Sequence, residues 1–241
     1  MVALLDEEVE ADLGLDRETA SVLDLGCGNG SLLFALRDDG WTGRLLGVDY
    51  SEKSVALARR IARTRAAQEK ADEEEDKDGE KREETSRQER TEQQKEQDDD
   101  ESEAAYGVQF QAWDVLNGSY ADVPASLSEP SPGWDLVLDK GTFDAISLSG
   151  ERDSQGRRIC EGYGSRVLHL LRPGGAFLVT SCNWTEAELK DWFDGKREKT
   201  GENETSVLKQ IARVEYPSFS FGGVKGQTIS TLCFVKEVVE A

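Results

Sequence analysis

The sequence has few of the residues that bind metals or cross-link chains. Its 241 residues include four cysteines and one histidine. The cysteines, Cys27, Cys160, Cys182 and Cys233, lie far apart and form no CxxC pair, and His169 is the one imidazole. This spacing argues against a zinc site, so we expect no bound metal, and it favours free thiols in a reducing compartment.

Long hydrophobic runs are also missing. No stretch has the apolar length of a membrane span, and the first residues, Met-Val-Ala-Leu-Leu followed by acids, lack the basic start and long apolar core of a signal peptide. We therefore expect a cytosolic protein, with the nucleus as an alternative location, and no membrane partner.

Aliphatic residues larger than alanine are absent between Ile61 and Tyr106. Within that stretch, Glu69 to Glu103 holds 18 acidic and 7 basic residues and contributes −11 to the total charge of −20. A segment with so little apolar surface has nothing to offset its ordering entropy. We predict that residues 65–105 form an acidic insertion, disordered or extending a helix into solvent; an interaction tail for a basic partner is the alternative.

The remainder of the chain is only mildly acidic and holds roughly 200 residues, enough for one domain with a sizeable core. We expect residues 1–241 to form a single monomeric domain that contains the insertion. An acidic surface repels phosphate backbones, which argues against nucleic acid as a partner.

Strand and helix patterns alternate outside the insertion. Short apolar runs predict buried strands at residues 22–25, 45–49, 108–110, 134–138 and 176–180. Two final strands, over 211–216 and 228–235, are close enough in sequence to pair antiparallel. Helices are predicted after Ser51, from Tyr163 to an Arg-Pro-Gly-Gly stop, and after a capping box that starts at Thr185. Such alternation indicates an α/β fold with a doubly wound, mostly parallel sheet.

The strongest local motif is Asp-Leu-Gly-Cys-Gly-Asn-Gly at residues 24–30, between a predicted strand and helix. Glycines let the backbone approach a ligand closely, and a carboxylate on the neighbouring strand can accept hydrogen bonds from both hydroxyls of a ribose. The motif predicts a site for an adenosine-containing cofactor. The residues expected there are Asp24, Gly26, Gly28, Asn29, Gly30, Asp49 and Tyr50.

Glycine spacing separates two cofactor classes. Dinucleotide enzymes have GxGxxG, which rests a pyrophosphate on the helix N-terminus, whereas this motif reads GxGxG. The charge of Asp24 would repel a pyrophosphate but can pair with the cationic amino group of a methionine moiety. A glycine turn with a surface aspartate is the structural alternative.

Asp114 follows the third predicted strand, where its carboxylate can accept a hydrogen bond from an adenine amino group, with Trp113 or Val115 beside the ring. A Trp-Asp pair at a strand end is also common as a core residue followed by a helix cap. Both interpretations stay open.

Two more segments end strands at the same predicted edge, where open α/β folds place their active sites. Asp139 begins the run Asp-Lys-Gly-Thr-Phe-Asp and is a candidate catalytic residue that holds a cationic substrate amine. Lys140 and Asp144 can form an ion pair or face water. Asn183 and Trp184 offer an amide and an indole to a substrate group, or else satisfy loop backbone and pack.

Four segments together resemble one known family, namely residues 22–30, 46–52, 137–148 and 177–186. The run Leu-Asp-Lys-Gly-Thr-Phe-Asp-Ala-Ile-Ser-Leu that starts at Leu138 is far more specific than a glycine loop. These segments are similar to the protein-lysine methyltransferases of translation elongation factor 1-alpha.

The resemblance implies a Rossmann-like class I methyltransferase fold with seven strands, the last inserted antiparallel. It also implies S-adenosylmethionine as the cofactor and elongation factor 1-alpha as the protein substrate. It assigns the ribose-binding acid to Asp49, the adenine-side acid to Asp114 and the post-strand turn to residues 139–142. One departure lies in front of the first strand, where the family has an aromatic-rich segment and this chain has no aromatic residue before Phe34.

Two rival functions remain open. A class I methyltransferase for RNA or a small molecule would share the cofactor half; amino-directed nucleic-acid enzymes, however, resemble one another in an Asn/Asp-Pro-Pro-Tyr/Phe run, and residues 139–142 lack its prolines. The other rival is a cofactor-binding scaffold without catalysis, for which the missing front segment and the charged insertion would be the supporting features.

Overall fold

A mixed sheet of eight strands forms the centre of the protein, in the order β3-β2-β1-β4-β5-β10-β7-β6. The computed structural model describes residues 13–75, 106–126, 133–200, 205–217, 219–221, 224–226 and 229–239. The sheet strands are β1 (Val22–Leu25), β2 (Leu45–Asp49), β3 (Val108–Ala112), β4 (Trp134–Lys140), β5 (Leu171–Ser181), β6 (Arg197–Lys199), β7 (Thr205–Arg213) and β10 (Ser230–Val239). A separate hairpin joins β8 (Phe219–Phe221) to β9 (Val224–Gly226).

The strand directions confirm the predicted architecture. Strands β3, β2, β1, β4 and β5 run parallel, and β10 lies antiparallel between β5 and β7. This is the inserted final strand that the resemblance implies. The short β6 adds an eighth strand at the edge beyond the seven expected.

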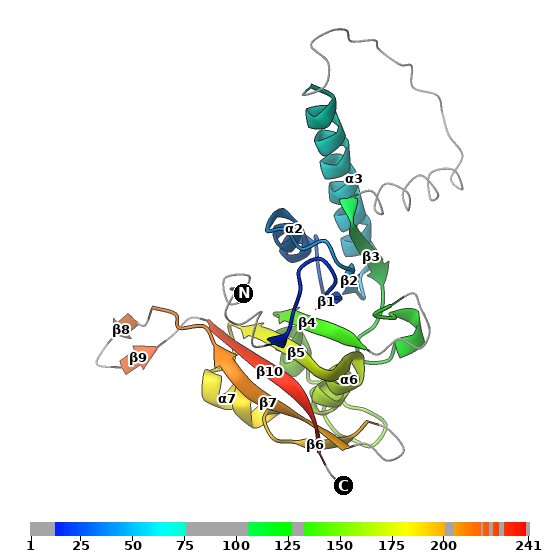
Figure 1. Ribbon diagram of the computed structural model, residues 1–241. Helices are drawn as coiled ribbons and strands as arrows, with labels where there is room; N and C mark the ends of the chain where they lie inside the picture. The colour runs from blue at the N-terminus through cyan, green and yellow to red at the C-terminus, as the bar shows by residue number, and fades with distance from the viewer. Residues whose placement is uncertain are drawn as a thin grey trace.

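Helices cover both faces of the sheet (Figure 1). They are α2 (Ser31–Asp38), α3 (Glu52–Glu75), α5 (Thr142–Leu148), α6 (Tyr163–Leu170) and α7 (Glu186–Phe193), with short 3-10 turns η2 (Tyr120–Asp122) and η3 (Ile159–Gly162). Successive residues of β1 point to opposite faces, so Val22 packs with α2 and α3, whereas Leu23 packs with α5, α6 and α7. Burial on both faces explains the continuous apolar strand sequences.

The insertion starts later than its predicted boundary at residue 65. Helix α3 packs on the sheet as far as Ala66, which is 5% exposed. Arg65 pairs with Asp38 at 2.9 Å and donates to the hydroxyl of the buried Tyr106 at 3.0 Å. Beyond this point α3 projects away from the sheet up to Glu75 (Figure 1), as the solvated-helix interpretation expects; residues 76–105 lie outside the described residues.

Two local predictions can be compared with the structure. The capping box of α7 is present, since Thr185 and Glu188 each bond the other's backbone N–H. The helical stripe from Tyr163 was predicted to include Leu171, but α6 ends at Leu170 and Leu171 opens β5, opposite Trp134. Leu171 is buried in either role, so its apolar character did not distinguish them.

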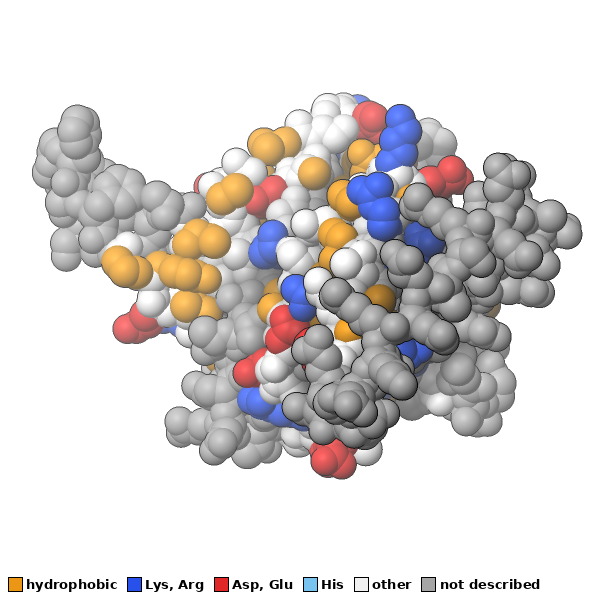
Figure 2. Space-filling model, turned by 90° about the horizontal axis from the view of Figure 1, so that it is seen from above, with side chains coloured by type: hydrophobic (Ala, Val, Ile, Leu, Met, Phe, Trp, Pro, Cys, Tyr) orange, Lys and Arg blue, Asp and Glu red, His pale blue; other side chains and the backbone are white. Residues whose placement is uncertain are grey.

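Three further observations concern the cysteines, the hydrophobicity of the helices and the distribution of surface charge. All four cysteines are free thiols, as predicted. None of the helices in the described ranges is long and apolar enough to cross a membrane. On the face displayed in Figure 2, lysine and arginine side chains lie among acidic ones, with no extended patch of one sign in the part that the structure describes.

Candidate active site

The predicted site residues meet at one edge of the sheet. Strand β1 lies between β2 and β4, and the connections that follow β1 and β4 lead to helices on opposite faces, α2 and α5. Open α/β sheets bind ligands at the carboxyl ends of the strands where the strand order reverses in this way. The loop after β1 and the turn after β4 flank that point.

The glycines of the loop adopt a conformation that other residues rarely reach. Gly26, Gly28 and Gly30 have φ values of 67°, 57° and 79°. A Cβ at Gly26 would overlap the Thr142 hydroxyl, and one at Gly30 would overlap the Phe110 ring, whereas a Cβ at Gly28 would meet nothing within 4 Å. Two glycines therefore allow close packing below the loop, and Gly28 faces open space in which a ligand can approach the backbone.

Asp49 ties the end of β2 to this loop. Its Oδ2 accepts a hydrogen bond from Gly28 N at 3.0 Å, and its Oδ1 accepts one from Ser51 N at 2.8 Å. The neighbouring Tyr50 is 85% exposed beside the site. Asn29 accepts from the backbone of Ser31 at 3.2 Å and so helps to start α2.

Asp24 is a buried carboxylate without a hydrogen-bond donor. It is 3% exposed, and no residue in the described ranges donates to it. Burial, followed by the negative charges of Asp139 and Asp49, raises the pKa of Asp24 to about 8, while Lys140 acts in the opposite direction. A buried anion is stable only with a positive partner, so this position favours a cationic ligand.

The carboxylate of Asp139, in contrast, accepts several hydrogen bonds from neighbouring residues. Its Oδ1 accepts from Thr142 N at 2.8 Å, and its Oδ2 accepts from Phe143 N at 2.9 Å and from the Tyr163 hydroxyl at 2.5 Å. Complete burial raises the pKa of Asp139 to about 6, with Asp144 acting in the same direction, while these three hydrogen bonds lower it. Asp139 therefore caps α5 and bonds α6; contact with a substrate amine stays a prediction.

Thr142 connects this turn to the cofactor loop. Its Oγ1 donates to Leu25 O at 2.6 Å, directly beneath Gly26. The last residue of β1 and the first turn of α5 are thereby held together.

Asp144 has a different role from both that were predicted for it. It is 4% exposed, so it does not face water, and its oxygens accept hydrogen bonds from the Ser181 hydroxyl and from Cys182 N, the latter at 2.9 Å. Lys140 is exposed. The predicted alternatives of an ion pair with Lys140 or a solvated Asp144 are wrong, because Asp144 joins α5 to the segment after β5.

That segment, residues 181–184, forms a tight turn around Ser181. The Ser181 Oγ accepts from Asn183 N at 3.1 Å and from Trp184 N at 2.9 Å, which leaves the Asn183 residue exposed at the site. Trp184 donates from Nε1 to Ser147 Oγ at 2.8 Å, and its partly buried ring packs against the rings of Phe143 and Trp192. Both residues border the edge, and their contact with a substrate stays a prediction.

Asp114 lies on a more exposed loop. Its oxygens accept from Leu116 N at 2.8 Å and from Asn117 Nδ2 at 2.9 Å. A turn at residues 115–117 follows Asp114, so it caps a turn and not the helix of the alternative interpretation. Trp113 is 6% exposed and bonds Ser119 O, so it belongs to the core, and Val115 is also buried. Adenine binding by Asp114 and Val115 stays a prediction.

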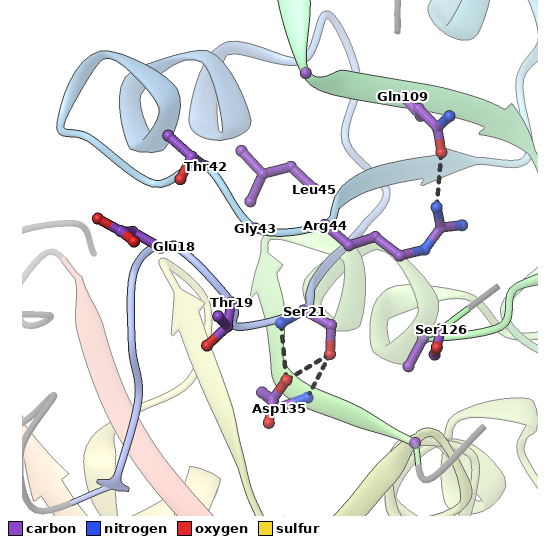
Figure 3. A pocket seen from close by; sticks show the side chains of 13 residues that line it. Glu18, Thr19, Ser21, Thr42, Gly43, Arg44, Leu45, Gln109, Ser126 and Asp135 are labelled. Carbon is purple, nitrogen blue, oxygen red and sulfur yellow. Dashed lines mark hydrogen bonds between the residues drawn. The ribbon is translucent and has the colours of Figure 1, made fainter. Parts of the chain in front are cut away.

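A cavity of about 770 Å³ lies at the opposite edge of the sheet (Figure 3). Among its lining residues, Ser21, Arg44 and Gly133 directly precede β1, β2 and β4. Its polar groups bond one another: Ser21 donates to Asp135 at 2.7 Å and Arg44 to Gln109 at 2.8 Å. None of the predicted site residues lines this cavity, so the candidate active site is the carboxyl edge.

The residues at the carboxyl edge fit S-adenosylmethionine. Its methionine part carries two positive groups, a sulfonium and an ammonium, which would stabilise the ionised form of Asp24 that burial disfavours. The Asp49 carboxylate uses two of about four acceptor positions on backbone N–H groups and can accept from ribose hydroxyls with the others. The open side of Gly28 leaves room for the ligand.

Fold and motif together define a class of enzyme. A family model described as a methyltransferase domain matches residues 16–76. Magnesium protoporphyrin IX methyltransferase (ChlM) from Synechocystis PCC 6803, solved with bound SAM, has the same fold with a TM-score of 0.50 at 16% identity, covering 95% of this chain and 76% of that one. The protein is a class I methyltransferase.

Sequence relatives narrow the class to one family. "Protein-lysine N-methyltransferase EFM4" of Saccharomyces cerevisiae is 34% identical over 221 residues, covering 91% of this chain and 72% of the relative. The corresponding Schizosaccharomyces pombe protein is 37% identical, covering 88% and 68%. "EEF1A lysine methyltransferase 2" of Homo sapiens is 30% identical, covering 90% and 66%. The chain belongs to this family of protein-lysine N-methyltransferases.

Sequence reasoning missed two roles at the site. Tyr163 was assigned only to a helical apolar stripe, and Thr142 only to a turn. A hydroxyl in an otherwise apolar stripe was the available signal for Tyr163, because a buried hydroxyl needs a partner. No local signal pointed to the contact of Thr142 with β1, since 117 residues separate the two groups.

Proposed function

We propose that this protein transfers the methyl group of S-adenosylmethionine to a lysine side chain of translation elongation factor 1-alpha. The observation that carries the proposal is the buried Asp24 carboxylate at the switch point of the sheet, which accepts no hydrogen bond from the described residues and suits a cationic methyl donor. The substrate is supported by relatives in Danio rerio, Mus musculus and Homo sapiens that are named EEF1A lysine methyltransferase 2 and are 29%, 32% and 30% identical.

The cofactor would supply an electrophilic methyl group on a sulfonium. Asp24 would hold its ammonium group, Asp49 its ribose, and the glycine loop would lie against the methionine part. Methyl transfer is a direct displacement, so these residues act by alignment, which can contribute about 7 to 11 kcal/mol in well-oriented reactions.

The lysine nucleophile must arrive without its proton, since its ordinary pKa is about 10.4. The turn 181–184 presents Asn183 at the edge of the site, and Asp144 holds that turn against α5. Asp139 contributes negative charge below the site, which favours a cationic amine before proton loss. We infer that these groups orient the amine toward the methyl group.

A labelling experiment separates this function from its rivals. Purified protein is incubated with radiolabelled S-adenosylmethionine and a cell extract. Label on a single protein with the mass of elongation factor 1-alpha supports the proposal. Label on RNA or on small molecules would favour the first rival, and cofactor binding without any transfer would favour a non-catalytic scaffold.

The Asp139→Asn variant tests the catalytic part of the proposal. We expect cofactor affinity to fall by no more than about tenfold and turnover to fall by much more, because a charge that orients the amine acts mainly on the transition state. Single-turnover methylation and calorimetric titration with the cofactor measure the two quantities. Asp38→Asn, on α2 at the other end of the sheet, is the matched control; normal turnover in Asp139→Asn would remove Asp139 from the reaction.

We also infer the cytosol as the location of this activity. Four free thiols without any disulfide are typical of a reducing compartment. Fractionation of cells that produce the tagged protein tests this inference, and recovery in the secretory pathway would contradict it.

A further inference from the structure

Tyr163 carries a hydroxyl into the most buried part of the site. The residue is 0% exposed and its ring packs against Phe143 and Phe193, with ring centres 5.4 and 6.4 Å away. A phenylalanine would fill the same apolar space. A hydroxyl that is removed from water without a partner is costly, so its presence points to the bond that it makes.

That bond is short and links two elements. The Tyr163 hydroxyl in α6 donates to Asp139 Oδ2 at 2.5 Å, at the end of β4. Burial and the Asp139 carboxylate raise the pKa of Tyr163 well above its usual value, so the phenol keeps its proton and acts as the donor. Asp139 is thus held ionised by three donors in a place where burial opposes its charge.

A continuous set of hydrogen bonds leads from Tyr163 to the cofactor loop. Asp139 accepts the backbone N–H groups of Thr142 and Phe143, and Thr142 donates to Leu25 O beneath Gly26. A protonated Asp139 has one acceptor position fewer, because one of its oxygens then carries a proton. Protonation would therefore loosen the turn that supports the loop.

The other charged groups around Asp139 do not replace the tyrosine. Asp144 on α5 is acidic and raises the pKa of Asp139. The charges of Asp139 and of Asp49 on β2 raise the pKa of Asp24 on β1. Lys140 on β4 is the basic group in this set; its charge acts on Asp24, and it is exposed to solvent, which screens it. The neutral donors, Tyr163 first among them, stabilise the Asp139 charge.

We propose that Tyr163 is a positioning residue for methyl transfer, whose hydroxyl keeps Asp139 ionised and thereby holds the Asp139–Thr142 turn against the cofactor loop. This inference rests on the proposed function, because it assumes that the loop binds S-adenosylmethionine. It assigns to α6 a role in the site that neither the glycine motif nor the sequence relatives indicate.

The test is the pH dependence of cofactor binding in Tyr163→Phe. Dissociation constants for S-adenosylmethionine are measured by calorimetry from pH 5 to pH 9. Affinity should change near pH 8, where Asp24 and the ammonium group of the cofactor both titrate, and in a lower break that belongs mainly to Asp139. Loss of a donor to the carboxylate raises its pKa, so the lower break should move upward by about one pH unit.

Near pH 6 the variant should then bind the cofactor up to about tenfold more weakly than the unmodified protein, while binding at pH 9 is unchanged. Tyr106→Phe is the matched control. Tyr106 is also buried and bonds an aspartate, Asp38, at 3.1 Å, but it lies beside the amino end of β3, away from the site. Its removal should leave both breaks in place.

A second variant keeps the hydroxyl and so protects against loss of folding. Site-specific 3-fluorotyrosine at position 163 is a stronger donor of almost the same size, and it should move the lower break to lower pH. In an Asp139→Asn background neither change at position 163 should move a break. A lower break that stays in place in folded Tyr163→Phe or in the fluorotyrosine protein would overturn the inference.

Failure of the proposed function would look different. In that case the unmodified protein would either bind no S-adenosylmethionine at any pH or bind it without methylating elongation factor 1-alpha. If the protein binds the cofactor but the lower break does not move in Tyr163→Phe, only the proposed role of Tyr163 is rejected.

Discussion

Two buried aspartates at the same sheet edge differ in how far the fold satisfies them. Asp139 accepts three hydrogen bonds, whereas Asp24 receives none from the residues that the structure describes. Asp24 is therefore the more available of the two to bind a ligand directly, whereas Asp139 can act on a substrate amine mainly through its charge. Sequence position alone placed both residues at strand ends and could not separate these roles.

The pKa of Asp24 makes the stability of the cofactor-free protein depend on pH. The folded value of about 8 lies above the unfolded value of about 3.9, so the folded state binds more protons between these values. The contribution of Asp24 to the free energy of unfolding is therefore fully present below pH 4. It is lost as the pH rises toward 8, by at most about 1.4 kcal/mol per pH unit.

Asp24→Asn removes this titration. Urea unfolding at pH 6 and pH 8 should show a smaller loss of stability on raising the pH in the variant than in the unmodified protein. Asp153→Asn, at a partly exposed aspartate with a lowered pKa, serves as the control. Equal pH slopes for Asp24→Asn and the unmodified protein would mean that Asp24 is already neutralised by a partner.

Asp49→Ala should weaken cofactor binding by about 1.5 to 3 kcal/mol, the usual range for a hydrogen bond to a charged group. Calorimetry measures this change. Asp16→Ala is a matched control, because Asp16 also accepts a backbone N–H two residues ahead, at 2.7 Å, but lies at the other edge of the sheet. Unchanged affinity in folded Asp49→Ala would exclude Asp49 from the ribose site.

At the scale of elements, the site is assembled by contacts between α5 and its neighbours. Asp144 bonds the turn after β5, Thr142 bonds the end of β1, and Asp139 bonds α6. The two most specific motifs of the family resemblance, around residues 138–148 and 180–186, are thus in direct contact. Their joint presence in the sequence has a structural reason.

Asp144→Ala tests whether the site depends on the contact between α5 and the turn after β5. Leaving the Cys182 N–H and the Ser181 hydroxyl without their acceptor should cost about 1 to 3 kcal/mol of stability and loosen the 181–184 turn. Thermal unfolding measures the first effect, and the KM for the protein substrate should rise more than the cofactor constant. Asp191→Ala on the exposed side of α7 is the control; an equal loss of stability there would refute the assignment.

Buried parallel strands were the elements most accurately predicted, because leucine and valine runs with flanking glycines identify them locally. The predicted bounds of β1 and β2 agree with the structure. Strand β7 begins at Thr205, six residues before its predicted start. The prediction began too late because the buried Ser206 interrupts the apolar pattern. The short edge strand β6, Arg-Glu-Lys, has no apolar residue and could not be recognised from sequence.

For the whole molecule, the alternation of strands and helices predicted a mostly parallel sheet covered on both faces, and the family resemblance implied the antiparallel last strand. Carboxyl-end placement then predicted that Asp24, Asp49 and Asp139 share one edge. The contacts that shape the site, such as Tyr163 with Asp139, join distant segments and depend on exact packing. Composition and periodicity carry no information about them.

The corrected boundary of the insertion gives a prediction for the whole fold. Replacing residues 69–104 by a short Gly/Ser linker should leave thermal stability and methyl transfer nearly unchanged. Replacing 65–105 should lower stability, because Arg65 and Ala66 pack against the domain. If the two replacements change thermal stability equally, the packing of Arg65 and Ala66 contributes nothing to stability. If replacing residues 69–104 reduces methyl transfer at low salt only, the insertion is an electrostatic docking arm.

The most direct test of the account uses two purified proteins. Recombinant elongation factor 1-alpha is incubated with this enzyme and S-adenosylmethionine, and its peptides are examined by mass spectrometry. We predict methyl groups on one lysine, added by the unmodified enzyme and strongly reduced with Asp139→Asn. An enzyme that binds the cofactor yet leaves every lysine of the factor unmodified would contradict the proposed function.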